Sequence, residues 1–209
     1  KVGEATELEE VLAVSFGKRL ISAILDGVLV FFLTMMLVFA IGFVFIFIGM
    51  YVDDQVMPIN ALAVIVGIAV ALVYFIGSWS KSGQTLAKAF LGYRVVGGDG
   101  RPLSSGKAAL RYLGYIVSAA LASLGFLWAA FDKKRQGLHD KMASSYVIYS
   151  DATLKDPSQI VPADSGPGWV WLVVWFVAAL VLPVGFLTGL IVLGPTLNSI
   201  VSSFLKGLF

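Results

Sequence analysis

Cysteine is absent from the 209-residue sequence, and histidine occurs once, at His139. Without cysteine the chain forms no disulfide bond and offers no thiolate to a metal ion. A lone histidine does not build a metal site, and its neighbour Asp140 would point about 100° away from it on a helix. No nucleophile-elbow motif accompanies this histidine either. We therefore expect a protein that is not an enzyme, with no catalytic residue, no metal ion and no cofactor.

Charge is scarce as well, because charged residues make up 13% of the chain and hydrophobic residues 58%. A globular domain carries roughly 25% charged residues. Here the apolar residues form long blocks rather than periodic stripes, which indicates a membrane protein. The net charge of +2 is small. Since the basic residues cluster at the ends of the apolar blocks, they favour contact with anionic lipid headgroups and not with nucleic acid.

The long apolar blocks predict the membrane-embedded segments, since about 20 apolar residues cross the hydrocarbon core. Four blocks of this kind occur, at Leu20–Val52, Ala61–Ser78, Tyr112–Phe131 and Val170–Leu193. The fourth contains Gly185 and Gly189 in a spacing that lets helices pack closely. It is followed by Thr196–Phe209, whose apolar residues gather on one helical face, as in an interfacial helix.

The third block raises a question of topology. The polar stretch Lys81–Arg111 before it is strongly basic, so the positive-inside rule predicts that it is cytoplasmic. The residues after Phe131 are also basic, and a full crossing would place them outside. Small residues between Ser118 and Gly125 would permit a break in the helix. We therefore favour a re-entrant segment over a third crossing.

Two opposite charges stand at the start of the first apolar block. Arg19 precedes it, and Asp26 is the one charged residue inside it. Seven residues make two helical turns, about 10 Å of rise, so the two side chains share a face without reaching each other. Because an unpaired carboxylate at that depth is costly, we expect Asp26 to contact Lys88 or Arg111. We expect Arg19 to pair with Asp140.

The remaining segments complete the predicted organisation. We predict strands at Tyr93–Val96 and Ser145–Tyr149, which can pair only if they lie on one side of the membrane. The fold class is an all-α membrane bundle with several spans, a re-entrant or third spanning segment and a small cytoplasmic β-hairpin-like element. Its predicted parts are an N-terminal interfacial helix (1–18), a membrane domain (19–150), a linker (151–168) and a C-terminal membrane helix with an amphipathic tail (169–209).

Several ordered motifs together carry a resemblance to a known family. Arg19 and Asp26 open the first span, Gly83-Gln84-Thr85 follows the second, and a Gly-Asp-Gly-Arg-Pro-Leu turn follows the first predicted strand. In this order the sequence resembles the RDD family of bacterial membrane proteins, over Phe16–Tyr149. The resemblance implies that the arginine and two aspartates of the family name are Arg19, Asp26 and Asp140. The motif residues that would support them are Lys88, Arg111, Arg135, Gln136 and His139.

The resemblance also implies a setting, a multi-pass protein of the bacterial cytoplasmic (inner) membrane with its N-terminus in the cytoplasm. Two functions remain open. In the first, the protein carries out ion- or proton-coupled transport, with a buried carboxylate as the switch. In the second, the charges form a static network and the protein is an accessory subunit of a larger membrane complex. Membrane lipids and a homo-oligomer or larger complex are the expected partners.

Overall fold

A computed structural model describes residues 9–47, 59–163, 168–179, 199 and 203 of the chain. These residues divide into two units, Lys1–Gly27 with Leu72–Trp175, and Val28–Ala71 with Phe176–Phe209. The predicted packing residues Gly185 and Gly189 lie outside the described residues, as does most of the predicted tail.

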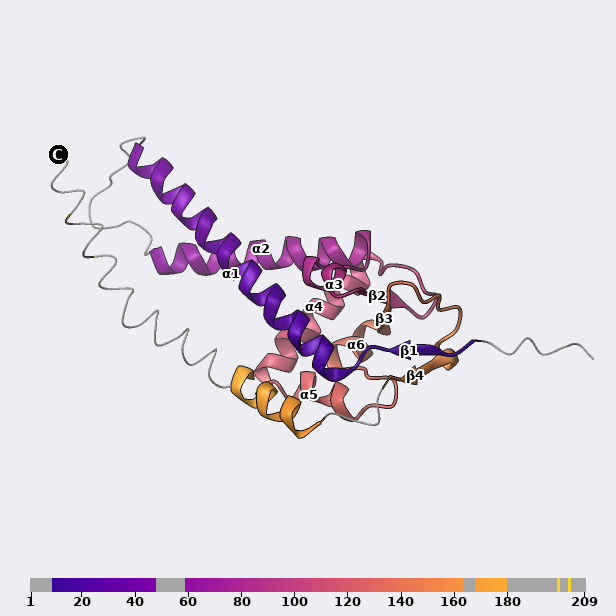
Figure 1. The fold of residues 1–209 in the computed structure, drawn as a ribbon. Coiled ribbons are helices and arrows are strands. Elements are labelled where there is room, and N and C mark those ends of the chain that lie inside the picture. Colours follow the sequence, from indigo (N-terminus) through magenta and orange to yellow (C-terminus); the bar gives the residue numbers. More distant parts are fainter. Residues whose placement is uncertain (1–8, 48–58, 164–167, 180–198, 200–202, 204–209) are drawn as a thin grey trace, which may run out of the picture. The chain divides into compact units, whose positions relative to one another are not determined.

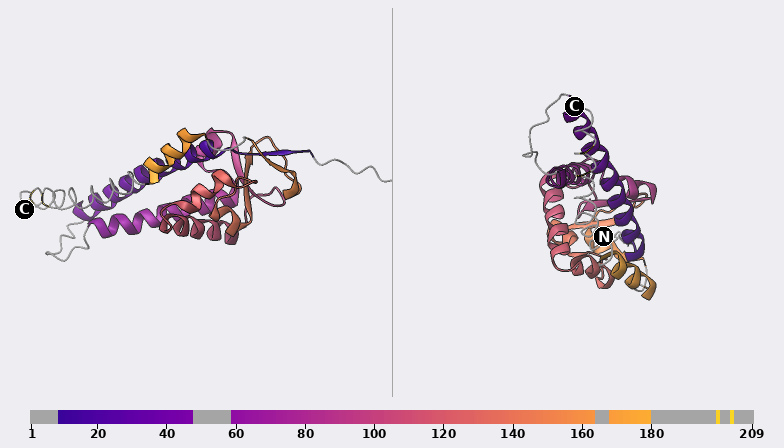
Figure 2. Two further views of the ribbon diagram at one scale, coloured as in Figure 1. Left: turned by 90° about the horizontal axis from the view of Figure 1, so that it is seen from below. Right: turned by 90° about the vertical axis from the view of Figure 1, so that its left-hand side faces the viewer.

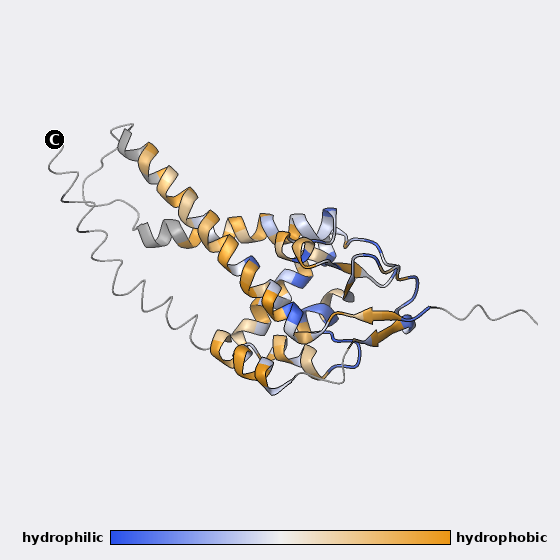
Figure 3. Cartoon of the chain, viewed as in Figure 1, coloured by the Kyte–Doolittle hydropathy of each residue, from blue (hydrophilic) through white to orange (hydrophobic). Residues whose placement is uncertain are grey.

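Two long apolar helices account for the first two predicted membrane segments. Helix α1 spans Phe16–Phe47 and helix α2 spans Ile59–Lys81, and both are long and apolar enough to cross a membrane. Their residues are strongly hydrophobic along most of their length (Figure 3). Within the second unit the two helices approach closely, since a Cβ on Gly67 would lie 3.4 Å from Thr34 Cγ2. Both predicted segments are long apolar helices where the structure describes them, with α1 beginning four residues earlier than expected and residues 48–52 lying outside the described part.

The first unit contains a four-stranded sheet in the order β2-β3-β1-β4. Strands β2 (Tyr93–Gly97) and β3 (Ser145–Tyr149) pair in antiparallel fashion, as the sequence predicted. Strand β1 (Val11–Ala13) is antiparallel to β3 and parallel to β4 (Ile160–Pro162). Strands β1 and β4, which are far apart in the sequence, therefore lie side by side in this sheet (Figure 1).

This sheet corrects three parts of the predicted architecture. The β-hairpin-like element is a four-stranded sheet, so the mostly helical fold is not all-α. The predicted interfacial helix of residues 1–18 is wrong where it is described, because residues 11–13 are a strand. The predicted linker of residues 151–168 contains a short 3₁₀ helix, Pro157–Gln159, and strand β4. Three-residue strands show too little alternation to be recognised, and their conformation depends on distant pairing partners.

Four shorter helices of the first unit surround the charged residues. They are α3 (Leu86–Phe90), α4 (Ser105–Ala120), α5 (Leu124–Phe131) and α6 (Leu138–Ala143). The axes of α4 and α5 differ by 103°, and Ala122 and Ser123 between them have positive φ angles of 50° and 64°. Gly125 lies directly against Ser118, where a Cβ would clash. The predicted break among small residues is confirmed.

The sheet and the helices of the first unit share a hydrophobic core. Its buried members include Val14, Trp79, Tyr93, Val95 and Val147. A second cluster joins Phe16 on α1 to α5 and to the helical segment Trp169–Ala179, which begins beside the first turn of α1 (Figure 2). The indole ring of Trp171 occupies the space that a side chain on Gly17 would need. This packing fixes the start of α1, and so the position of Arg19.

Candidate functional site

Asp140 lies at the centre of the larger of two buried charge clusters. Its carboxylate, which is fully buried, accepts hydrogen bonds from Arg19 Nη2 on one oxygen and Arg111 Nη1 on the other. The backbone N–H of Gly137 donates to Oδ2 at 2.9 Å, and Ser145 Oγ lies 3.3 Å from Oδ1. Asp140 therefore caps its own helix, α6, and ties that helix to α1, α4 and β3.

The charges around Asp140 fix its protonation state. Burial alone would raise the pKa of Asp140, but the guanidinium groups of Arg111 and Arg19 outweigh burial and hold this pKa well below its usual value. An arginine side chain stays protonated in proteins, so neither partner can leave by losing a proton. The Asp140 cluster is therefore permanently charged at neutral pH.

His139 is beside this cluster but remains uncharged. Its Nε2 lies 3.2 Å from Asp140 Oδ2, and its ring packs edge-on against Tyr115 at 4.5 Å between centroids. Burial lowers the pKa of His139 to about 4, against the opposing effect of Asp140. Among the described residues no group of three or more potential ligands is placed to hold a metal ion.

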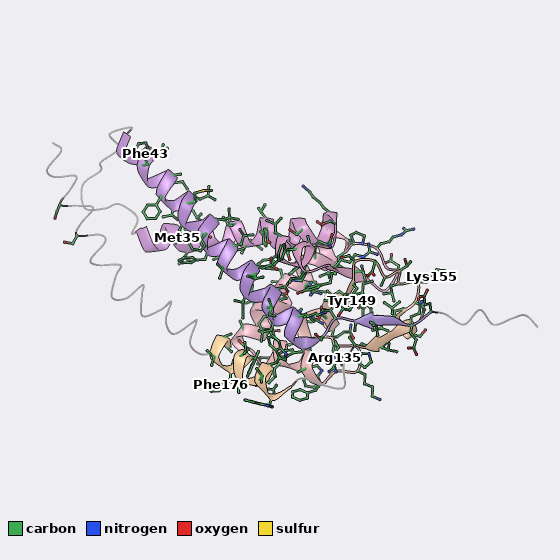
Figure 4. All side chains as sticks on the ribbon, in the orientation of Figure 1. Met35, Phe43, Arg135, Tyr149, Lys155 and Phe176 are labelled. Carbon is green, nitrogen blue, oxygen red and sulfur yellow. The ribbon has the colours of Figure 1, made fainter. Side chains whose placement is uncertain are left out.

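Arg135 and Gln136 shape the turn that carries Asp140. Arg135, labelled in Figure 4, makes two of the contacts at this turn. Its backbone carbonyl accepts a hydrogen bond from Arg19 Nη1, and the Arg135 guanidinium donates to the carbonyl of Ala130 at the end of α5. Gln136 Nε2 donates to the Ser145 carbonyl at 3.0 Å. A cation at a helix C-terminus also interacts favourably with the helix dipole. Both residues hold the turn between α5 and α6 in place.

Asp26 forms a second and separate cluster of different chemistry. The carboxylate is fully buried, and Lys88 Nζ lies 3.3 Å from Oδ2. Thr85 Oγ1 donates to Oδ2 at 2.7 Å and Tyr74 OH donates to Oδ1 at 2.7 Å. The backbone N–H of Ala87 also donates to Oδ1, at 3.3 Å. Asp26 on α1 is thus bound by residues of α2 and of the segment around α3.

The periodicity of the two helices builds this second cluster. Ser22 and Asp26 are four residues apart on α1 and so lie on one face, and Lys88 Nζ reaches Ser22 Oγ at 3.3 Å as well as Asp26. Thr85 is the N-cap of α3, so its hydroxyl also accepts a hydrogen bond from the Lys88 backbone N–H at 3.4 Å. The carboxylate and the ammonium carry opposite charges, which leaves the cluster with no net charge.

The structure assigns the predicted charges to these two clusters. Arg19 binds Asp140, as predicted, and Asp26 has a basic partner, which is Lys88. Arg111, the other predicted partner of Asp26, binds Asp140 instead. Asp26 is therefore not a side-chain partner of the Arg19–Asp140 pair, and Ser22 links its cluster only to the backbone carbonyl of Arg19.

Four residues that contribute side chains to the two clusters were not predicted from the sequence as site residues, namely Ser22, Tyr74, Thr85 and Ser145. The position of Ser22, one helical turn before Asp26, was a signal that could have found it. Thr85 stood in a motif but had no assigned role. Tyr74 lies in a long apolar run, where an aromatic residue reads as lipid packing, and only the fold shows that its hydroxyl reaches a carboxylate.

Comparison with known proteins agrees with the extent of these motifs. Residues 13–144 match the model of the RDD family. The uncharacterized protein YxaI of Bacillus subtilis is 28% identical over 148 residues, which cover 64% of this chain and 95% of that protein. The proline-rich antigen of Mycobacterium leprae is 26% identical over 106 residues, or 48% of this chain and 43% of that protein.

No solved structure matches the chain. The family match includes Arg19, Asp26 and Asp140, together with α1 to α6. It covers more than half of the 209 residues. With its apolar helices long enough to cross a bilayer, this is a membrane protein, and it belongs to the RDD family.

Proposed function

We propose that this protein exchanges a proton for a small cation at Asp26, while the Asp140 cluster holds the helices in place. The observation that carries the proposal is the buried Asp26–Lys88 pair at 3.3 Å. A lysine can withdraw its single ammonium group on a flexible stem, whereas a rigid arginine fork with two hydrogen bonds is harder to displace. Asp26 therefore has a partner that can be replaced.

The atoms around this pair suit a small cation. The hydroxyl groups of Tyr74 and Thr85 donate hydrogen bonds to the Asp26 carboxylate, and the Ser22 hydroxyl oxygen contacts Lys88 Nζ beside it. Hard cations prefer oxygen ligands of this kind. If Lys88 withdraws, a cation or a proton on Asp26 would restore neutrality in the buried site, and a bare carboxylate there would be costly.

The sheet supports a topology for this transporter. Strand β2 precedes α4 and α5, β3 follows them, and the two strands pair along five residues each. The chain between them must then leave and return on one side of the membrane. With the bend of 103°, this favours α4 and α5 as a re-entrant segment. The basic loops and the N-terminus would face the cytoplasm of a bacterial inner membrane.

An accessory subunit is the second candidate function. The observation that favours it is the row of exposed apolar side chains on α4 and α5, among them Leu113, Ile116 and Trp128. Such a surface suits lipid, a second copy of the chain or a larger membrane complex. A foreign protein recovered in fixed stoichiometry from the native membrane would support this candidate.

The test uses the purified protein in liposomes that contain a pH-sensitive dye. A gradient of Na⁺, K⁺ or Li⁺ should drive proton movement in the wild type, and Asp26→Asn should abolish it. The matched control is Asp99→Asn on the exposed turn after β2, which should leave the rate unchanged. A wild-type rate in folded Asp26→Asn would overturn the proposal.

A further inference from the structure

Helix α3 has two faces of opposite character. Thr85, Ala87 and Lys88 are buried, with exposed fractions of 0%, 8% and 4%. Leu86 and Phe90 are exposed to 64% and 86%, although both are large and apolar. They are four residues apart and so share one side of the helix. The buried face of this five-residue helix touches Asp26, and the exposed face touches no described part of the protein closely enough to cover it.

Nearly all contacts of Asp26 pass through this short segment. Three of its four donors belong to residues 85–88, namely Thr85 Oγ1, the Ala87 N–H and Lys88 Nζ. The fourth donor, Tyr74, accepts a hydrogen bond from the Leu86 N–H at 3.0 Å. A displacement of α3 would therefore break three of these contacts and loosen the fourth, which would open the carboxylate to solvent.

The chain reaches α3 shortly after a candidate membrane span. Helix α2 is a candidate span that exposes Val73 to 76%, and it ends at Lys81. Helix α3 begins five residues later, and a segment so close to the end of a span is expected at the interface between hydrocarbon and water. Amphipathic helices with a leucine or phenylalanine face lie in this interfacial zone. Lipid is therefore the occupant that fits Leu86 and Phe90.

We propose that α3 is a lipid-anchored cover over Asp26. Leu86 and Phe90 insert into the interface of the bilayer, and this contact keeps Thr85, Ala87 and Lys88 on the carboxylate. The state of the lipid then sets how often Asp26 is open to the cytoplasm. This goes beyond the proposed exchange of cations, because it concerns the position of α3 and holds whether or not an ion is moved.

The absence of native cysteine makes the first test direct. A spin label on Phe90→Cys is studied in liposomes of phosphatidylethanolamine and phosphatidylglycerol, with Arg101→Cys on the exposed turn after β2 as the matched control. The label at position 90 should be relaxed more strongly by oxygen than by a water-soluble nickel chelate, and the label at position 101 should show the reverse. A label at 90 that behaves like the one at 101, or that neither reagent reaches because another protein covers it, overturns the proposal.

The second test asks whether the lipid contact keeps the site closed. Ser22, which is fully buried beside Lys88, is replaced as Ser22→Cys and treated with a membrane-impermeant maleimide. Adding Leu86→Gln and Phe90→Gln should raise the labelling rate at least tenfold, and the apolar control Leu86→Met with Phe90→Leu should leave it low. The double Gln variant must unfold at the same temperature as the apolar control. If its labelling rate at position 22 is then also unchanged, the lipid contact of α3 does not keep Asp26 covered, and the proposal is overturned. Neither test measures transport, so the proposed function can fail separately.

Discussion

Two buried aspartates of one chain have opposite kinds of partners. Asp140 is held by two arginines, and Asp26 by one lysine and two hydroxyl groups. Both carboxylates are fully buried. An arginine keeps its charge and its fork geometry, whereas a lysine carries a single ammonium group on a flexible stem that can move away. The difference teaches that burial alone does not make a carboxylate a switch, since the partner decides whether the pair can separate.

The largest expected effect comes from breaking the fixed cluster. Asp140→Asn keeps the shape of the side chain but leaves the buried Arg111 and the partly buried Arg19 without their carboxylate. We expect a loss of about 3–5 kcal/mol in the free energy of unfolding. Thermal or denaturant unfolding in detergent measures it, with Asp99→Asn as the exposed control.

A double-mutant cycle separates a structural pair from a transport group. If Arg19 and Asp140 act as a pair, Arg19→Ala with Asp140→Asn should cost less than the sum of the two single changes. A stable Asp140→Asn protein that no longer moves protons in liposomes would contradict the fixed role of this cluster.

Acid should weaken the Asp140 cluster through its neighbour His139. This side chain titrates near pH 6.5 when unfolded and at about 4 when folded, so the unfolded state binds more protons between these values. Stability must then fall as the pH is lowered through this window, by about 2 kcal/mol between pH 7.5 and 5. The contribution of Asp140, whose pKa is depressed, is lost only at more acidic pH.

The measurement for His139 is the pH dependence of unfolding in the wild type and in His139→Gln. The variant should lack the part of the slope between pH 6.5 and 5, because glutamine has no proton to bind there. Parallel curves for the two proteins would show that His139 is not the group responsible.

At the second carboxylate the comparison predicts a smaller effect on stability and a larger one on transport. Asp26→Asn removes the anion beside Lys88, but the flexible stem of the lysine lets its ammonium group move away. We expect about 1–2 kcal/mol of destabilisation, the cost of weakened hydrogen bonds. If Asp26→Asn lowered the free energy of unfolding as much as Asp140→Asn under the same conditions, both clusters would have the same structural role.

The smallest effect is expected at Tyr74. Tyr74→Phe removes the hydroxyl that donates to Asp26 and accepts from the Leu86 N–H, and it leaves the ring, so the loss should be about 1 kcal/mol. In the Asp26→Asn background the same substitution should cost less, since the bond is already weakened. If Tyr74→Phe lowered the free energy of unfolding equally in both backgrounds, the Tyr74 hydroxyl would not stabilise the protein through Asp26.

The features that depend on local pattern could be predicted from sequence. The length of the apolar blocks indicated α1 and α2, and alternation gave β2 and β3 nearly to the residue. The seven-residue spacing of Arg19 and Asp26 excluded a direct ion pair between them. The prediction that Arg19 pairs with Asp140 instead agrees with the structure.

The features that depend on distant contacts could not be predicted in this way. Lys88 and Arg111 both belong to the basic stretch Lys81–Arg111, so the sequence offered either as the partner of Asp26. Only the fold shows that α3 brings Lys88 to Asp26, whereas α4 places Arg111 against Asp140 on α6. Strands β1 and β4 have three residues each, so their pairing across the whole domain left no periodic signal. The bend between α4 and α5 was foreseen from small residues, but its angle depends on the packing of Gly125 on Ser118.

The parallel pairing of β1 with β4 has a consequence for biosynthesis. Val11 faces Ile160 in this sheet, so the first strand waits for about 150 residues to be made before its edge is covered. At 5–20 residues per second the delay is about 8–30 seconds, during which α1 to α6 emerge from the ribosome. The apolar helices α1 to α5 therefore have time to enter the bilayer before the sheet is complete, and a chain that stops before Ile160 would leave one edge of β1 unpaired.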